Sequence, residues 1–170
     1  MNNEVTMLHL ASPKSNSSLS VFTDDQVQPN AIDLRIDKLF KVTSSQFIIS
    51  EQDKFHRGSV ELPPAKDGFW NLYPGTYEII MEGTIKLAED EAGWVITRST
   101  LNRNGAFITS GLYDSGYEGV MAGVLHVSCG QMRIAKGTRV GQFLLFKSEA
   151  LHAYDGSYGI GKEHDEKYGV

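Results

Sequence analysis

Apolar residues recur along the chain in short segments separated by turn residues. Within several segments apolar and polar positions alternate, which is the period of a strand with one buried face. The six clearest segments are AIDLRI from Ala31, QFIIS from Gln46, GTYEIIM from Gly75, GWVITR from Gly93, VMAGVLHV from Val120 and VGQFLLF from Val140. Strands of this length and spacing predict an all-β fold.

Turns and polar chain ends complete this pattern. YPGTY at residues 73–77 and KDGFW at residues 66–70 place their glycines where hairpin corners favour them. LAEDEAG at residues 87–93 is the stretch for which we expect helical content. The first twenty or so residues and the last fifteen look like arms outside the core, because they are rich in polar residues. We expect one domain with an N-terminal arm over residues 1–150 and a flexible tail over residues 151–170.

Composition limits the classes of partner. The 170 residues carry 16 basic and 21 acidic side chains, a net charge of −5, which disfavours binding to a nucleic-acid backbone. Cys129 is the single cysteine, so we expect no internal disulfide, and the N-terminus lacks the pattern of a signal peptide. No apolar run has the length of a membrane span. We expect a soluble, cytoplasmic protein (in the host cell, if the source is a virus) that binds neither nucleic acid nor membrane.

Several familiar site patterns fail on this chain. GSYGIGKE from Gly156 matches the first seven positions of a phosphate-binding P-loop, but Glu163 stands where the magnesium-binding hydroxyl belongs, and only a few polar residues follow. The tail, with Tyr158 and Lys162, would instead close over a ligand or simply fray. The five histidines lack zinc-ligand spacing, and no serine lies in a GxSxG turn.

The span RSTLNRNGAFITSGLYDSGYEG, residues 98–119, concentrates polar chemistry without a helical period. Arg98, Ser99, Thr100 and Arg103 put guanidinium and hydroxyl donors at the end of a strand and in the turn that follows. Such donors suit a chain of phosphate oxygens. A solvated loop with a capping hydroxyl would use the same residue types, so this cluster alone leaves both interpretations open.

A second polar group lies in GLYDSGYEG, residues 111–119. Asp114 occupies a hairpin-like turn between two tyrosines. Aspartate is common in turns for reasons of local hydrogen bonding alone. The functional interpretation gives Asp114 a water to orient and gives Tyr117 a flat face for a sugar or base.

Five segments, in order along the chain, resemble the motifs of the trimeric dUTP pyrophosphatases (dUTPases) and dCTP deaminases, which share one fold. They are AIDLRI, LYPGTYEI, GWVITRSTLNRNG, SGLYDSGYEG and GTRVGQFLLF, within residues 31–146. The resemblance implies a distorted jelly-roll β-barrel that assembles into a homotrimer, with each active site built from neighbouring subunits.

The two branches of this family differ in chemistry. In the deaminases, a glutamate five residues beyond the last glycine of the third motif handles the protons of water attack on cytosine. The corresponding residue after Gly119 is Val124, which cannot transfer a proton. Asp114 and Tyr117, by contrast, match the dUTPase pattern. The resemblance therefore implies magnesium-dependent hydrolysis of dUTP to dUMP and pyrophosphate.

Residue roles follow from the same resemblance. Asp114 would be the catalytic residue that positions the attacking water, Tyr117 would pack against the deoxyribose, and Asp33 would order Mg²⁺ indirectly, through water. The other substrate-binding residues implied are Arg98, Ser99, Thr100, Arg103 and Gln142 for the phosphates, Thr109, Ser110 and Gly111 for the base, and Tyr158 and Lys162 in the tail. The tail departs from the dUTPase pattern, because this tyrosine and lysine replace a phenylalanine and an arginine.

Two alternatives remain open. The hairpin AFITSG from Ala106 is nearer to the deaminase form, so a dCTP deaminase or a bifunctional enzyme is the first. The second is a non-catalytic nucleotide-binding regulatory protein, which would keep the barrel and use its unusual tail to contact a partner.

Overall fold

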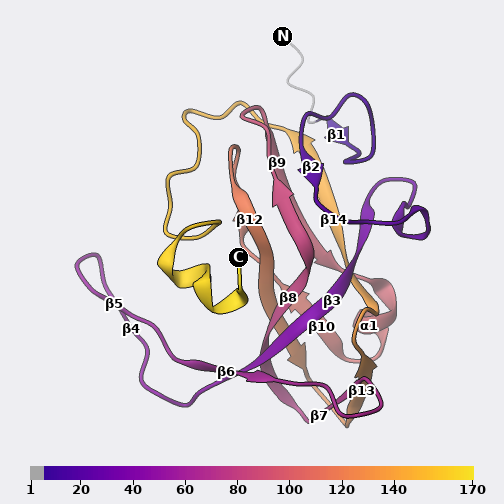
Figure 1. Ribbon diagram of the computed structural model, residues 1–170, viewed down its shortest axis with the longest axis vertical. Helices are drawn as coiled ribbons and strands as arrows, with labels where there is room; N and C mark the ends of the chain where they lie inside the picture. The colour runs from indigo at the N-terminus through magenta and orange to yellow at the C-terminus, as the bar shows by residue number, and fades with distance from the viewer. Residues whose placement is uncertain (1–5) are drawn as a thin grey trace.

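Residues 6–170 are described by a computed structural model, and they form a strongly curled β-sheet with few helical turns (Figure 1). The strands are β1 (Met7–Leu8), β2 (Ser18–Leu19), β3 (Ile32–Val42), β4 (Ile48–Ile49), β5 (Lys54–Phe55), β6 (Ser59–Leu62), β7 (Phe69–Leu72), β8 (Gly75–Lys86), β9 (Glu91–Thr97), β10 (Ala106–Thr109), β11 (Leu112–Tyr113), β12 (Glu118–Val127), β13 (Met132–Ala135) and β14 (Arg139–Lys147). The helical elements are the 3₁₀ turns η1 (Asp24–Gln26) and η2 (Glu163–Tyr168) and the short helix α1 (Ser99–Arg103). The expected all-β, jelly-roll-like fold is confirmed.

The main sheet closes on itself. Within residues 6–170 it has ten strands, in the order β10-β12-β8-β3-β14-β9-β11, with β1 on β14, β2 on β8 and β6 on β3. Its ends meet where Thr97 of β9 bonds to Ile108 of β10: the Thr97 hydroxyl donates to Ile108 O (3.0 Å) and accepts from Ile108 N (2.7 Å). A side chain therefore replaces the missing ladder between these two strands, as barrel closure requires.

The core follows from the alternation along the long strands. The largest fully buried side chains are Phe143, Ile32, Leu34, Ile36, Leu39, Ile79, Met81, Ile85, Met121, Leu125, Leu145 and Glu91. Nearly all of them come from β3, β8, β12 and β14, the strands that the sequence pattern predicts. Burial of each apolar side chain contributes about 1.5–3 kcal/mol to folding.

The N-terminal segment packs on the barrel, which corrects the expectation that it lies outside the core. Leu8, Leu10 and Leu19 belong to the buried core cluster. Glu91 is fully buried and accepts hydrogen bonds from Ser15 Oγ (2.7 Å) and Ser17 Oγ (2.6 Å). Residues 1–5 of the predicted arm lie outside the described residues.

The prediction of helical content at residues 87–93 is wrong. Residues 89–90 form a turn, and β9 begins at Glu91 and pairs with β14 up to Lys147. The buried carboxylate of Glu91 fixes this segment as a strand, because its donors lie on the N-terminal segment. The helix α1 forms instead directly after Arg98, over five residues that are too few to show a helical period.

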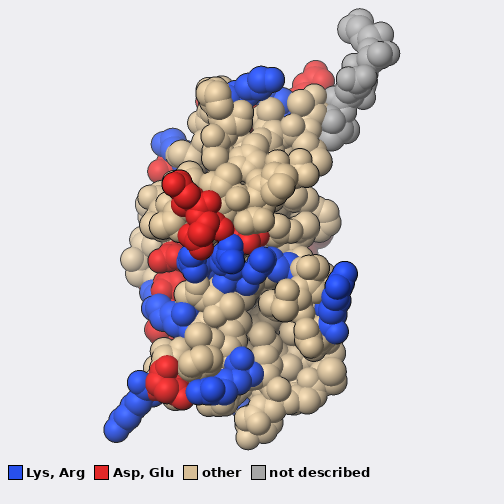
Figure 2. All heavy atoms as spheres, turned by 90° about the vertical axis from the view of Figure 1, so that its right-hand side faces the viewer, with Lys and Arg blue, Asp and Glu red and all other residues tan. Residues whose placement is uncertain are grey.

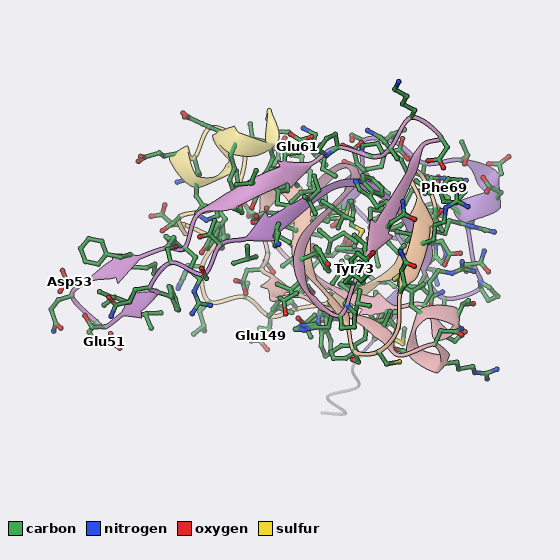
Figure 3. All side chains as sticks on the ribbon, turned by 90° about the horizontal axis from the view of Figure 1, so that it is seen from below. Glu51, Asp53, Glu61, Phe69, Tyr73 and Glu149 are labelled. Carbon is green, nitrogen blue, oxygen red and sulfur yellow. The ribbon has the colours of Figure 1, made fainter. Side chains whose placement is uncertain are left out.

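A hairpin projects from the barrel. The predicted strand from Gln46 is present as the two-residue β4, which pairs only with β5. Figure 3 shows this hairpin leaving the barrel, with Glu51 and Asp53 at its tip. Across residues 6–170, no helix has the length and apolar character needed to cross a membrane.

Candidate active site

Three neighbouring strands bring predicted phosphate-site residues together. The register of β14 places Gln142 beside Asp33 of β3 and beside Ile96 of β9. Gln142 Nε2 donates to Asp33 Oδ1 (3.1 Å), and Arg98 Nε lies 3.2 Å from Asp33 Oδ2. Asp33 is fully buried, so its charge needs these partners. We call Asp33, Arg98, Arg139 and Gln142 the arginine cluster.

Two arginines of this region were missed by sequence reasoning. Arg139 Nη1 lies 3.5 Å from Asp33 Oδ2 and donates to Asp25 O (2.6 Å). Arg35 Nη2 donates to Asp25 Oδ2 (2.7 Å). A hydrogen bond from Thr23 and the charges of Arg35 and Arg139 hold the pKa of Asp25 below its ordinary value. Only the pairing of Arg35 with Arg139 across β3 and β14 brings these groups together, and no local motif indicates that register.

The charges of one face are mixed. Figure 2 shows acidic and basic side chains meeting near the middle of that face, without a continuous basic surface. Among residues 6–170, Asp33 Oδ2 is a buried acceptor without a hydrogen-bond partner, despite the two guanidinium groups near it. Among residues 6–170, no three His, Cys, Asp or Glu side chains gather as metal ligands. The buried, unpartnered Oδ2 of Asp33 fits a contact to the water shell of a bound cation.

The other predicted phosphate residues lie on or beside α1. Arg98 precedes the helix, and its backbone N–H donates to Val140 O (3.0 Å), which ties it to β14. Ser99, Thr100 and Arg103 belong to α1 and are exposed. The structure therefore brings Arg98, but not the whole predicted set, into the arginine cluster.

A pocket of about 690 Å³ lies over β8 and β12, and we call it the aromatic pocket. Strands β8 and β12 contribute Glu78, Val120, Ala122, Gly123 and Val124 to its lining. The hairpin region contributes Phe47, His56 and Arg57, and the predicted third motif contributes Gly111, Leu112, Tyr113 and Tyr117. The tail contributes Tyr154, Tyr158, His164, Asp165, Lys167 and Tyr168. An apolar pocket with a few polar groups is the usual form of a small-molecule site.

Three residues that the sequence analysis assigns to substrate binding, Tyr117, Gly111 and Tyr158, line this pocket. The Tyr117 hydroxyl donates to Val120 O (2.8 Å), and burial raises the pKa of this hydroxyl well above its ordinary range. The phenol is therefore neutral and presents an apolar ring. A Cβ at Gly119 would lie 2.5 Å from the Tyr117 hydroxyl, so this ring position requires glycine there.

A carboxylate faces the same pocket beside Val124. Glu78 of β8 lies opposite Val124 of the neighbouring strand β12. It accepts a hydrogen bond from the Tyr168 hydroxyl and lies 3.0 Å from Lys167 Nζ. Burial by itself raises the pKa of Glu78, but hydrogen bonds from Tyr168, Ser59 and Lys167 outweigh it and lower that pKa below its ordinary value. Glu78 is therefore charged and already occupied by partners.

Asp114 lies away from the arginine cluster. It is exposed, its carboxylate makes no hydrogen bond or ion pair to other residues in the range 6–170, and it lines a second pocket of about 490 Å³ with Ser115 and Tyr154. Tyr113, just before it, pairs with Gly93 near the start of β9, whereas Arg98 follows the end of that strand. The rise of a strand puts the two ends roughly 15–20 Å apart. Within one chain, Asp114 and Arg98 cannot contact the same phosphate group.

The remaining predicted residues have local partners. Thr109 Oγ1 lies 3.1 Å from His126 Nε2, and the Ser110 hydroxyl donates to Gly111 O (2.9 Å). Lys162 is exposed, and its Nζ lies 4.0 Å from Asp155 Oδ1. Lys162 does not line the aromatic pocket.

Comparison with known proteins assigns a family. A family model described as dCTP deaminase-like matches residues 3–148. The chain belongs to this dCTP deaminase-like family. One relative, from Halobacterium salinarum and named "Probable deoxyuridine 5'-triphosphate nucleotidohydrolase", is 34% identical over 139 residues, 79% of this chain and 84% of the relative. Another, from Bifidobacterium longum and named "dCTP deaminase, dUMP-forming", is 29% identical over 160 residues, 89% of this chain and 82% of the relative.

Solved structures share the dCTP deaminase-like fold. The 2'-deoxycytidine 5'-triphosphate deaminase from Agrobacterium tumefaciens gives a TM-score of 0.58 at 18% identity and covers 79% of this chain; this chain spans 44% of that one. A point mutant of the dUTPase of Staphylococcus bacteriophage 80alpha, with dUpNHpp, gives 0.50 at 12% identity, over 84% of this chain and 97% of that one. The resemblance and the jelly-roll fold expected from the sequence are thus confirmed.

Proposed function

We propose that this protein hydrolyses dUTP to dUMP and pyrophosphate. The observation that carries the proposal is that Asp33 of β3, Gln142 of β14 and Arg98, directly after β9, meet in one cluster that would bind phosphate. A prearranged charge site is what phosphoryl transfer chiefly requires. Relatives named as dUTP nucleotidohydrolases support this substrate.

In the proposed reaction, water attacks the α-phosphorus of dUTP. The new bond joins the water oxygen to phosphorus, the bond to the α–β bridging oxygen breaks, and pyrophosphate leaves. Asp114 orients the water and takes its proton, a role for which its exposed, unpaired carboxylate is suited. The arginines stabilise the charge on the phosphate oxygens.

Magnesium enters the proposal together with the substrate. When bound, Mg²⁺ neutralises the charge of the triphosphate. The phosphates would hold it mainly, and Asp33 would contact its waters through the carboxylate oxygen that accepts no hydrogen bond. Arg98 and Gln142 keep Asp33 fixed, so this chain contributes position and charge.

Neighbouring subunits complete the proposed site. Asp114 and Arg98 lie at opposite ends of β9, too far apart to act on one phosphate within a chain. Cyclic assembly brings different surfaces of identical chains together. We therefore propose the homotrimer that is typical of the family, in which Asp114 of one subunit meets the arginine cluster of the next.

The aromatic pocket would hold the nucleoside. Tyr117 offers its ring to the deoxyribose, and Gly111, which also lines the pocket, belongs to the segment at residues 109–111 that would read the base. Tyr158 reaches the pocket from the tail, whereas Lys162 would need a tail movement to reach a phosphate. The pocket lining includes Val124, which has no proton to transfer.

Deamination of dCTP is the second candidate, because Glu78 places a carboxylate beside Val124. A relative named "dCTP deaminase, dUMP-forming" adds weight to it. Against it, the Glu78 carboxylate already accepts a hydrogen bond from Tyr168 and forms an ion pair with Lys167. A non-catalytic nucleotide-binding regulator would keep both pockets but turn over neither nucleotide.

The test is parallel release of pyrophosphate and ammonia from dUTP and dCTP with Mg²⁺ present. We expect pyrophosphate from dUTP and no ammonia from dCTP. Ammonia from dCTP would contradict the assignment and point to Glu78. Binding of dUTP without either product would identify a regulatory protein.

A further inference from the structure

The end of the tail converges on one carboxylate. The Tyr168 hydroxyl donates to Glu78 Oε1, and Lys167 Nζ lies 3.0 Å from Oε1 and 3.2 Å from Oε2. Glu78 lies on β8, far away in the sequence, and only 16% of its side chain is exposed. A charge so placed needs donors, and residues of the tail supply them.

Apolar and backbone contacts support this attachment. The Tyr168 ring packs edge-on against Phe40 (5.7 Å between centroids) and is buried with Ile80 and Val120. Lys38 Nζ donates to Tyr168 O (2.6 Å). The tail is therefore docked on the outer face of β3, β8 and β12.

Earlier tail residues fold around the same attachment. The Gly159 N–H donates to the buried carboxylate of Asp165 (2.7 Å), and the Ile160 N–H donates to Glu118 O (3.0 Å). A Cβ at Gly159 would lie 2.7 Å from Glu118 O, so glycine permits this close approach. The Ile160 amide thus reports directly on docking to β12, and the Gly159 amide reports on the fold of the tail itself.

The docked tail forms a wall of the aromatic pocket. Tyr158, His164 and Tyr168 all line it. The His164 ring lies 4.9 Å from the ring of His56, which comes from the segment after the projecting hairpin. Departure of the tail would remove this wall and open the pocket toward solvent.

We propose that Glu78 is a positioning residue, which holds the C-terminal segment over the aromatic pocket before the nucleotide binds. This rests on the proposed function, in which dUTP is the ligand of the aromatic pocket. A site that is complete in a larger fraction of molecules binds its ligand with a lower apparent dissociation constant. Glu78 therefore lowers the KM for dUTP and takes no part in hydrolysis.

The test compares Glu78→Ala, Glu78→Gln and Tyr168→Phe with the control Glu82→Ala. Glu82 lies on the same strand and is exposed. For Glu78→Ala we expect exchange of the Gly159 and Ile160 amides without nucleotide to accelerate about tenfold, and KM to rise about tenfold with kcat kept within about twofold. Glu78→Gln still accepts a hydrogen bond and lies between wild type and Ala. Tyr168→Phe keeps its ring packing and loses part of the protection, and Glu82→Ala changes neither quantity.

Three results would overturn the proposal. Unchanged amide exchange in Glu78→Ala and Tyr168→Phe would show that the carboxylate does not hold the tail. A loss of kcat at constant KM, or ammonia release from dCTP that depends on Glu78, would make Glu78 catalytic. If the wild type released no pyrophosphate, the proposed function would fail, while amide exchange would still decide whether Glu78 holds the tail.

Discussion

The arginine cluster and the turn that carries Asp114 contrast within one chain. Asp33 is fully buried between two guanidinium groups and the Gln142 amide. Asp114 is exposed, and its carboxylate has no partner in residues 6–170. The two carboxylates thus face opposite electrostatic conditions.

This contrast separates binding from chemistry. A carboxylate that two guanidinium groups and an amide hold is fixed in place, whereas an exposed one is free to orient a water. The fold therefore builds the charge site in advance and leaves the proposed base open. Because the two groups lie at opposite ends of β9, the proposed site takes Asp114 from a second chain.

The largest effect is expected for Asp114→Asn. The variant keeps the turn but loses the proposed base, so kcat for dUTP should fall by about 10³ while the melting temperature stays unchanged. Steady-state kinetics and thermal unfolding measure the two quantities. Near-normal turnover would remove Asp114 from the mechanism.

Asp33→Asn should act mainly on stability. It leaves the guanidinium group of Arg98 without its counter-charge and that of Arg139 with Asp25 alone. We expect a loss of roughly 2–3 kcal/mol in unfolding free energy, because both arginines are about a third exposed and keep some hydration. Denaturant titration checks this. A variant as stable as wild type would show that the cluster is not held by its buried charge.

Arg98→Lys should have a smaller effect, on binding. Lysine keeps the charge but loses the planar fork, which contacts Asp33 and which we propose also binds phosphate, so the KM for dUTP should rise about tenfold with the fold intact. Isothermal titration with a non-hydrolysable dUTP analogue separates binding from turnover. An unchanged affinity would place the phosphates elsewhere.

The smallest effect concerns pH. The pKa of Asp25 lies below its ordinary value of 3.8, chiefly through the hydrogen bond from Thr23 and the charges of Arg35 and Arg139. Its contribution to stability is therefore complete above pH 3.8 and is lost as the pH falls through the lowered value. NMR titration of the Asp25 carboxyl carbon should give a midpoint below 3.8, and Arg35→Gln should raise it. A midpoint at or above that ordinary value would contradict the contact.

The strands were predictable because their pattern is local. Alternation marks β3, β8, β9, β12 and β14, and turn residues mark their ends. The helix α1 was not predicted, because five residues are too few to show a helical period. The site was predictable only where a motif carries it: Arg98, Gln142 and Asp33 belong to motifs, and the strand register then joins them.

The residues missed depend on long-range pairing. Arg139 looks like any solvated arginine until β14 places it opposite Arg35. In the sequence Glu78 is one of the polar residues of an alternating strand. Its contacts to Lys167 and Tyr168 exist only because the tail folds back onto β8. Local sequence cannot report such contacts, because their partners are more than eighty residues away.

The central claim is that Asp114 of one subunit acts on a phosphate held by Arg98 of another. Mixing Asp114→Asn with Arg98→Ala chains, both inactive alone, tests it directly. Random assembly gives roughly a quarter of sites with both groups intact, so about that share of wild-type pyrophosphate release should return. Mixed assemblies, verified by native mass measurement, that stay as inactive as their components would contradict the account.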